Sequence, residues 1–259
     1  MAKLRLDKLM QERGLVPSRE RALGMILAGR VLVDEQKITK AGTAVDTEAF
    51  IRTLGEEMQY VSRGGLKLRG ALDAWQIDLT GRCGVDVGAS TGGFTDCMLQ
   101  AGAVAVLAID TGFGQMAMSI RTDARVRLME RTNARLLPRT ALHHEARILL
   151  GGRELAPDFF AMDVSFISAT LVLPAVVQSL GTDAEAWRGE GIVLVKPQFE
   201  AGRQWVGKGG IVRDPAAYTV AVDRVRAAVS ALGGTTLDVR ESPITGAEGN
   251  HEFLLHCRF

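Results

Sequence analysis

The chain has 259 residues, of which 47% are hydrophobic and 24% are charged, and its formal net charge is +1. These values are ordinary for a globular protein with one large domain, or with one large and one small domain. No apolar run approaches the ~20 residues that span a bilayer, the start has no secretory leader, and three widely spaced cysteines predict no metal site. We therefore expect a cytoplasmic protein that needs neither a membrane nor a metal.

Two short helices and a hairpin are predicted at the N-terminus. The helical spacing of apolar residues over 4–13 predicts a helix that ends at Gly14. Ser18 is a typical N-cap and begins a second helix that ends near Gly29. The stretch VLVDEQKITK, residues 31–40, predicts a strand, a polar turn and a second strand.

This small unit is locally basic. Residues 1–30 carry seven basic and three acidic side chains, a net charge of +4, which suits a phosphate backbone but fits a solvated face about as well. Residues 3–55 resemble the S4 RNA-binding domain through Arg5-Leu6-Asp7, Ser18-Arg19 and the VLVD hairpin strand. The family usually has Asn-Gly at the hairpin turn, where this chain has Asp34-Glu35, so the turn geometry stays open. The resemblance implies an S4 domain over residues 1–55, with RNA contacts from Arg5, Lys8, Arg19 and Arg21.

Strands and helices alternate over the rest of the chain, after a linker at residues 56–63. The apolar runs that indicate strands are 83–88, 104–110, 126–130, 158–164, 192–195, 235–242 and 251–258. Helical segments such as SATLVLPAVVQSL lie between them. This alternation predicts a doubly wound, Rossmann-like α/β sheet over residues 64–259.

A glycine-rich turn follows the first of these strands. The string DVGASTGGFTD, residues 86–96, contains neither a Walker loop nor the dinucleotide fingerprint GxGxxG. Asp86 has the place at which a methyltransferase holds the methionine end of S-adenosylmethionine (SAM). Asp110 can accept both ribose hydroxyls of a nucleoside, and Asn133 can bind an adenine edge, although each residue taken singly also fits an ordinary loop cap. The predicted SAM-binding residues are Asp86, Gly88, Ser90, Gly92, Gly93, Phe94, Asp110, Asn133 and Asp163.

Four ionisable side chains are predicted at the same edge of the sheet. Lys67 opens a helix, where a cation opposes the helix dipole and needs a nearby acid. Asp163 and Lys196 end the fourth and fifth strands, and Glu252 opens the last one. Two lysines and two acids balance in charge, so they can share a buried cluster. A desolvated lysine beside another cation can take the proton of a ribose hydroxyl, which makes Lys196 the candidate base.

Several motifs extend this pattern over nearly the whole chain: YVSRGGLKLRGAL, DVGASTGGFTD, ERTNAR, MDVSFIS, LVKPQFE and SPITGAEGNHEFL. They are similar to the TlyA family of S4-containing ribosomal RNA 2′-O-methyltransferases, some of which carry the name haemolysin. The resemblance implies an FtsJ-like catalytic domain, SAM as cofactor, and a cytidine in ribosomal RNA as substrate. It also implies a catalytic tetrad of Lys67, Asp163, Lys196 and Glu252.

The length of the chain bears on which ribosomal subunit is modified. Family members that also modify the small subunit are longer at both ends, whereas this chain stops after its last predicted strand. We therefore expect the shorter type, a monomer that acts on 23S rRNA of the large subunit alone.

A glycine-rich basic loop follows Lys196. It contains Arg203, Trp205 and Lys208, and cations beside an aromatic ring are what a flipped base and its phosphates need. A merely mobile loop explains the same composition nearly as well. We expect these three residues, together with Arg63, to contact RNA.

Three other functions are compatible with parts of the sequence. A base N-methyltransferase would carry an Asn-Pro-Pro-Phe box after the fourth strand, where this chain has Asp163-Val164-Ser165-Phe166. A non-enzymatic S4 protein that only binds rRNA would not need the tetrad. A pore-forming haemolysin would need a leader or a membrane-active helix, and we find neither pattern.

Overall fold

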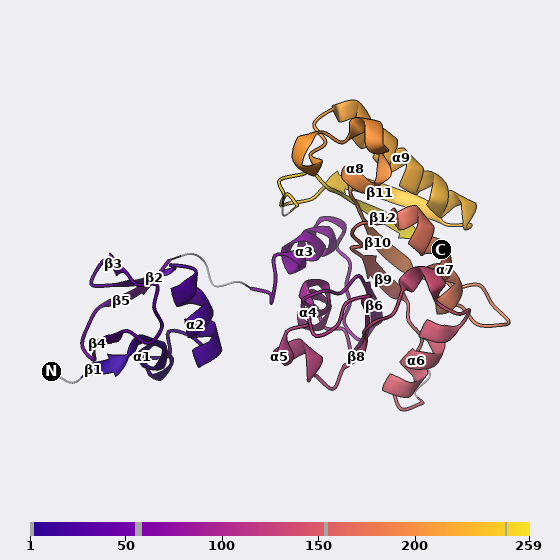
Figure 1. The fold of residues 1–259 in the computed structure, drawn as a ribbon. Helices are drawn as coiled ribbons and strands as arrows, with labels where there is room; N and C mark the ends of the chain where they lie inside the picture. The colour runs from indigo at the N-terminus through magenta and orange to yellow at the C-terminus, as the bar shows by residue number, and fades with distance from the viewer. Residues whose placement is uncertain (1–2, 55–58, 153–154, 247) are drawn as a thin grey trace. The chain divides into compact units, whose positions relative to one another are not determined.

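The computed structural model describes residues 3–54, 59–152, 155–246 and 248–259 (Figure 1). The chain divides into two compact units, Met1–Glu57 and Met58–Phe259, and each is described by itself. Residues 56–58 of the predicted linker lie outside the described residues. Within the described ranges, no helix is both long and apolar enough to cross a membrane.

The first unit is a small α+β structure. Its core is apolar and includes Leu6, Met10 and Ile26, all fully buried. Ser18 accepts a hydrogen bond from Arg21 N at 3.2 Å, which confirms the predicted N-cap. The elements are β1 (Lys3–Arg5), α1 (Leu6–Glu12), α2 (Arg19–Leu27), β2 (Val31–Val33), β3 (Gln36–Lys37), β4 (Ala44–Asp46) and β5 (Ile51–Thr53). Strand β1 pairs with β4, and the second sheet has the order β3-β2-β5.

The hairpin turn between β2 and β3 forms without glycine. Asp34 and Glu35 both have positive φ, 48° and 63°, a conformation that usually favours Asn-Gly. Asp34 Oδ1 accepts a hydrogen bond from Phe50 N at 2.9 Å, and Glu35 forms an ion pair with Arg52 at 2.7 Å. These side-chain contacts offset the backbone strain, so the departure from the usual turn residues leaves the hairpin intact.

The second unit is built on one mixed sheet of seven strands in the order β11-β12-β10-β9-β6-β7-β8. The strands are β6 (Cys83–Val87), β7 (Ala105–Ile109), β8 (Val126–Met129), β9 (Phe159–Met162), β10 (Glu190–Val195), β11 (Thr235–Glu241) and β12 (Phe253–Arg258). All pairings from β10 to β8 are parallel, and β12 runs antiparallel between β10 and β11. Every predicted strand is present, but Glu252 lies just before β12 rather than inside it. The start of β12 therefore lies at the edge where the parallel strands end.

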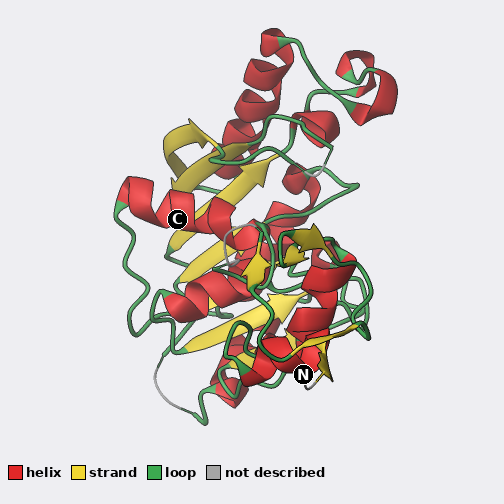
Figure 2. Cartoon of the chain, turned by 90° about the vertical axis from the view of Figure 1, so that its left-hand side faces the viewer, coloured by secondary structure: helices red, strands yellow, loops and turns green. Residues whose placement is uncertain are grey.

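Helices cover both faces of this sheet (Figure 2). One apolar core lies under α3 (Gly64–Trp75), α4 (Gly93–Gln100) and α5 (Met118–Arg121). The other lies under α6 (Ala141–Leu149), α7 (Ala169–Leu180) and α9 (Pro215–Ala231). Short pieces complete the unit: α8 (Pro197–Glu200), η1 (Ala134–Leu136), η2 (Arg203–Trp205) and η3 (Lys208–Gly210). Strands buried on both faces have the continuous apolar sequence that made them recognisable.

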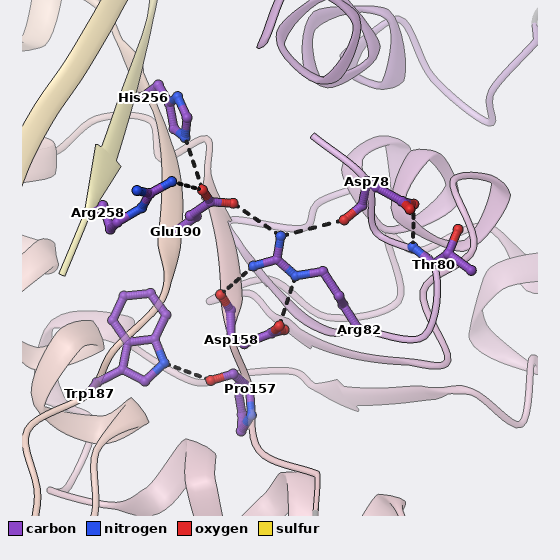
Figure 3. A network of polar contacts seen from close by, with 9 residues as sticks. All are labelled: Asp78, Thr80, Arg82, Pro157, Asp158, Trp187, Glu190, His256 and Arg258. Carbon is purple, nitrogen blue, oxygen red and sulfur yellow. Dashed lines mark hydrogen bonds and ion pairs between the residues drawn. The ribbon is translucent and has the colours of Figure 1, made fainter. Parts of the chain in front are cut away.

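An ionic network joins the strands at the other end of the sheet, where the parallel strands begin (Figure 3). Arg82 binds Asp158 at 2.8 Å and Glu190 at 3.1 Å, and Arg258 binds Glu190 at 2.6 Å. Burial opposes the charge of Glu190, but the hydrogen bonds from Arg258 and Arg82 win and hold its pKa below the usual range. The network therefore fixes the starts of β6, β9 and β10, away from the edge where the polar loops meet.

Candidate active site

The loop after β6 is shaped by glycines that no other residue can replace. Gly88 has a φ of 89°, and a Cβ atom there would lie 2.4 Å from the backbone oxygen of Asp163. Gly93 begins α4, and a Cβ atom there would lie 2.2 Å from Ser62 Oγ. Gly88 lets this loop pass directly against the end of β9, and Gly93 lets it pass against Ser62 and the start of α3.

Asp86, in strand β6, binds helix α4, which follows this loop. It is fully buried, and its Oδ2 accepts hydrogen bonds from Thr95 N at 2.8 Å and Thr95 Oγ1 at 2.6 Å. Burial raises the pKa of Asp86 to about 7. Asp86 lines neither of the cavities described below. Its Oδ2 links strand β6 to helix α4, whereas its Oδ1 has no hydrogen-bond partner among the described residues. That Asp86 faces the methionine end of SAM stays a prediction.

One cavity of about 550 Å³ lies at the ends of β7, β8 and β9. Asp110 lines it and accepts hydrogen bonds from Ser90 N at 2.7 Å and Gly112 N at 2.6 Å. Asn133 also lines it and accepts from Arg135 N at 3.1 Å. A carboxylate and an amide on adjacent strand ends suit the hydroxyls and the base of a nucleoside.

A second cavity of about 560 Å³ lies beside the first and shares Gly88, Ser90 and Asp163 with it. Lys67 lines this cavity, so the lysine of α3 and the aspartate of β9 meet in one space. Its further lining includes Arg63, Gly93, Phe94 and Thr245. Gly92 lines neither cavity; with a φ of 94° it forms the N-cap of α4.

Lys67 and Glu252 form the first buried ion pair of the site. Lys67 Nζ donates to Glu252 Oε2 at 2.6 Å, and the two residues are only 8% and 3% exposed. A lysine in the first turn of a helix faces the positive end of the helix dipole, and Glu252 supplies the compensating charge. The partner expected for Lys67 is therefore present.

Lys196 and Asp163 form the second ion pair. Lys196 Nζ lies 2.6 Å from Asp163 Oδ1 and donates a hydrogen bond to Ser165 Oγ at 2.7 Å. Lys196 is 8% exposed, at the end of β10, where Pro197 begins α8 and turns the chain out of the sheet. The well-directed hydrogen bond goes to Ser165, so two oxygens hold the amine in place.

Ser165 is the site residue that the sequence patterns did not single out. It lies in the segment Asp163-Val164-Ser165-Phe166, which we weighed only as a substitute for an Asn-Pro-Pro-Phe box. The signal for Ser165 in the sequence was its place two residues after Asp163, the acid at the end of the predicted strand. Phe166 is 93% exposed, has a φ of 65° and lines the cavity at the ends of β7, β8 and β9.

The predicted RNA contacts of the second unit separate into two groups. Arg63 lines the cavity with Lys67 and donates to the backbone oxygen of Thr245 at 3.3 Å. Arg203 and Lys208 are exposed. Trp205 is half-buried and packs against the main apolar core; that it meets a base stays a prediction. Packing of the ring removes apolar surface from water and thereby holds the loop against the core.

Three of the four predicted RNA contacts in the first unit have acidic partners. Arg5 and Arg19 bind the buried Asp7 at 3.0 and 2.9 Å, and Arg5 above all holds the pKa of Asp7 well below its usual range. Lys8 lies 3.5 Å from Glu12. The side chains of Arg5 and Arg19 nevertheless stay 56% and 53% exposed, so their outer faces are open to a phosphate.

Comparison with known proteins matches both units. The FtsJ-like methyltransferase profile matches residues 60–259, and the S4 domain profile matches residues 4–51. The 16S/23S rRNA (cytidine-2′-O)-methyltransferase TlyA of Mycobacterium tuberculosis is 43% identical over 255 residues, which cover 98% of this chain and 89% of that one. The 23S rRNA (cytidine-2′-O)-methyltransferase TlyA of Campylobacter jejuni is 32% identical over 198 residues, 76% and 70% of the two chains.

A solved structure, a hemolysin candidate from Streptococcus thermophilus, is 39% identical and superposes with a TM-score of 0.70. It covers all of this chain, and 89% of its own chain is matched. An S4 match followed by a methyltransferase match, over a sheet whose polar edge carries two buried ion pairs, places this chain in the TlyA family.

Proposed function

We propose that this protein transfers the methyl group of SAM to the 2′-hydroxyl of a cytidine in ribosomal RNA. Lys67 and Asp163 line one cavity, and each forms an ion pair, Lys67 with Glu252 and Asp163 with Lys196. That cavity borders the one that Asp110 and Asn133 line. This arrangement is the observation that carries the proposal. The TlyA relative at 43% identity supports the substrate, because its name states this reaction. The cofactor of the family is SAM, which supplies a methyl group bound to a positively charged sulfur.

The residues of the two cavities fit SAM. Gly88 stands where any side chain would collide with Asp163, so the backbone can approach a ligand closely. We propose that Asp110 and Asn133 hold the nucleoside half, and that Gly88, Ser90, Gly93 and Phe94 surround the remainder. We propose that Asp86 lies near the methionine end of SAM, because Thr95 binds only its Oδ2 and its Oδ1 has no hydrogen-bond partner among the described residues.

The four ionisable residues then have distinct roles. Lys196 takes the proton of the ribose hydroxyl. Asp163 and Ser165 orient its amine. Bound SAM would supply the methyl group to the ribose oxygen, and the electron pair of its carbon–sulfur bond would stay on sulfur. Positioning of the hydroxyl against the methyl group supplies most of the remaining rate enhancement, since the methyl group is already activated.

Lys67 and Glu252 complete the site. We propose that Lys67 donates to the ribose oxygen, while Glu252 holds that lysine in place. Arg63, Arg203 and Lys208 would bind phosphates of the RNA near the cavity. Arg5, Lys8, Arg19 and Arg21 would bind phosphates through the S4 domain, for which we propose the bounds 1–55, followed by a linker at 56–63 and a catalytic domain at 64–259.

The finer part of the proposal concerns the ribosomal subunit. We propose a cytoplasmic monomer that modifies 23S rRNA alone; the name of the Campylobacter relative states 23S only, whereas the name of the more similar Mycobacterium relative states 16S and 23S.

Mapping of ribose methylation on both rRNAs, from strains with and without the gene, tests the proposal. Loss of one 23S cytidine methyl group is the expected result. Loss of a 16S methyl group would contradict the subunit choice, and no loss in either rRNA would contradict the activity itself. Lysis of red cells by the purified protein without any SAM-dependent product would favour a haemolysin instead.

A further inference from the structure

Glu200 is a buried carboxylate that lines neither cavity. It ends α8, four residues after Lys196, and is 1% exposed. Its Oε2 accepts a hydrogen bond from Ser168 Oγ at 2.5 Å, and its Oε1 accepts from Ala169 N at 2.6 Å. The charge thus lies at the N-terminus of α7, where backbone N–H groups are otherwise unpaired and the helix dipole favours an anion.

These contacts join the two segments that carry the second ion pair. One segment runs from Asp163 through Ser165 to the start of α7, and the other runs from Lys196 through α8. Main-chain bonds hold Glu200 itself, because its N donates to Lys196 O at 3.1 Å and its O accepts from Arg224 Nη1 at 2.6 Å. A ring contact between Phe166 and Phe199, 5.7 Å between centroids, links the same two segments.

Burial of a carboxylate in this space costs free energy. Burial raises the pKa of Glu200 even though Ser168 and Ala169 both donate to it. An apolar side chain would avoid that cost, but it could not fix the distance between α7 and α8. Two short, directed hydrogen bonds set that distance to within tenths of an ångström.

We infer that Glu200 is a positioning residue: by tying the start of α7 to the end of α8, it holds Lys196 Nζ against Asp163 and Ser165. The inference rests on the proposed function, in which Lys196 receives the proton. A lysine displaced by about 1 Å loses on the order of 100-fold in rate while ligand binding is unaffected.

Steady-state kinetics of the full chain on rRNA, with calorimetric SAM binding, tests this role. For Glu200→Ala we expect kcat to fall about 10- to 100-fold, with the SAM dissociation constant and the KM for rRNA within about threefold of wild type. Glu200→Gln keeps an acceptor for Ala169 N and offers its amide to Ser168 Oγ, so it should restore kcat to within about fivefold. If Glu200→Ala does not fold, Glu200→Asp carries the test, because it keeps the charge but cannot reach α7.

The matched control is Glu190→Ala, at the start of β10, the strand that Lys196 follows. Glu190 is also a partly buried carboxylate with two donors, but it lies away from the cavities. It should lose stability while kcat stays within about twofold. A wild-type kcat in a folded Glu200 variant, or a parallel loss of SAM affinity, would overturn the inference. A wild-type protein that methylates no rRNA would instead overturn the proposed function.

Discussion

Lys67 Nζ and Glu252 Oε2 lie 2.6 Å apart, although 185 positions separate the two residues in the chain. The contact joins the first turn of α3 to the residue before β12, at the edge where the parallel strands end. Both side chains are nearly removed from solvent. Each charge therefore depends on the other, and removal of either one leaves a buried charge unpaired.

A double-mutant cycle on this pair should show strong coupling. Lys67→Met is expected to lower the free energy of unfolding by about 3–5 kcal/mol, because Glu252 is left buried without its partner. The combination with Glu252→Gln should cost less than the sum of the single changes, by about 1–3 kcal/mol. Urea unfolding of the four proteins measures the coupling. Additive changes would mean that the pair contributes no interaction energy.

Gly88→Ala should abolish SAM binding in an otherwise folded protein. The added Cβ would collide with Asp163 O, at 2.4 Å, and push the loop away from the end of β9. We expect the dissociation constant for SAM, measured by calorimetry, to rise at least about 100-fold, since a misplaced loop loses most of its contacts.

Gly81→Ala is the matched control for that change. Gly81 also has a positive φ, 76°, but an added Cβ would meet nothing within 4 Å. It therefore carries the backbone strain, about 1 kcal/mol of stability, without the collision. Equal loss of SAM binding in both variants would assign the effect to strain alone.

The stability of the protein should depend on pH through Asp86. Its pKa is raised from 3.8 to about 7 by burial, so the folded chain binds this proton more tightly than the unfolded chain does. The resulting stabilisation is complete below pH 3.8 and is lost as the pH rises to about 7. Asp86→Asn removes this dependence. From pH 4 to pH 8 the stability of the variant should improve relative to wild type by up to about 4 kcal/mol.

Chemical unfolding at a series of pH values measures this difference. Asp78→Asn serves as the control, because Asp78 is exposed and its pKa is lowered rather than raised, first of all by the hydrogen bond from Thr80 N. That variant should keep the slope of the wild type above pH 5. An unchanged slope in Asp86→Asn would show that Asp86 is ionised in the folded protein over this whole range.

The ionic network at the far edge should contribute to stability and not to catalysis. Arg82→Ala removes the shared partner of Asp158 and Glu190, and we expect a loss of about 2–4 kcal/mol in the free energy of unfolding. Arg125→Ala breaks a more exposed pair with Asp123 and should cost less than about 1 kcal/mol. Thermal and urea unfolding test the ranking; similar costs would show that the network adds nothing beyond a surface pair.

The sequence predicted the elements of the catalytic unit well because its central strands, β6, β7, β9 and β10, are buried on both faces. Such strands appear as uninterrupted apolar runs, and their carboxyl ends define an edge on which Asp110, Asp163 and Lys196 must meet. Glu252 could be placed there too, since an antiparallel strand starts where its parallel neighbours end. The tetrad itself came from family resemblance, and the structure resolves it into two pairs.

What the sequence could not predict is the direction in which a side chain points. Asp86 sits in a strand with both faces buried, and only the position of Thr95 shows that its carboxylate turns toward α4. Trp205 lies in a basic loop, yet its ring packs against the apolar core. Ser165 and Glu200 depend on contacts between segments 30 or so residues apart, which local patterns do not contain.

Nucleoside analysis of 23S rRNA after incubation with SAM and either wild-type protein or Lys196→Ala tests the central claim most directly. Wild type should produce 2′-O-methylcytidine. Lys196→Ala should produce at least about 1,000-fold less, since the base is lost, while it still binds SAM and RNA. Undiminished 2′-O-methylcytidine from Lys196→Ala, or a methyl group on the base instead of the ribose, would contradict the account.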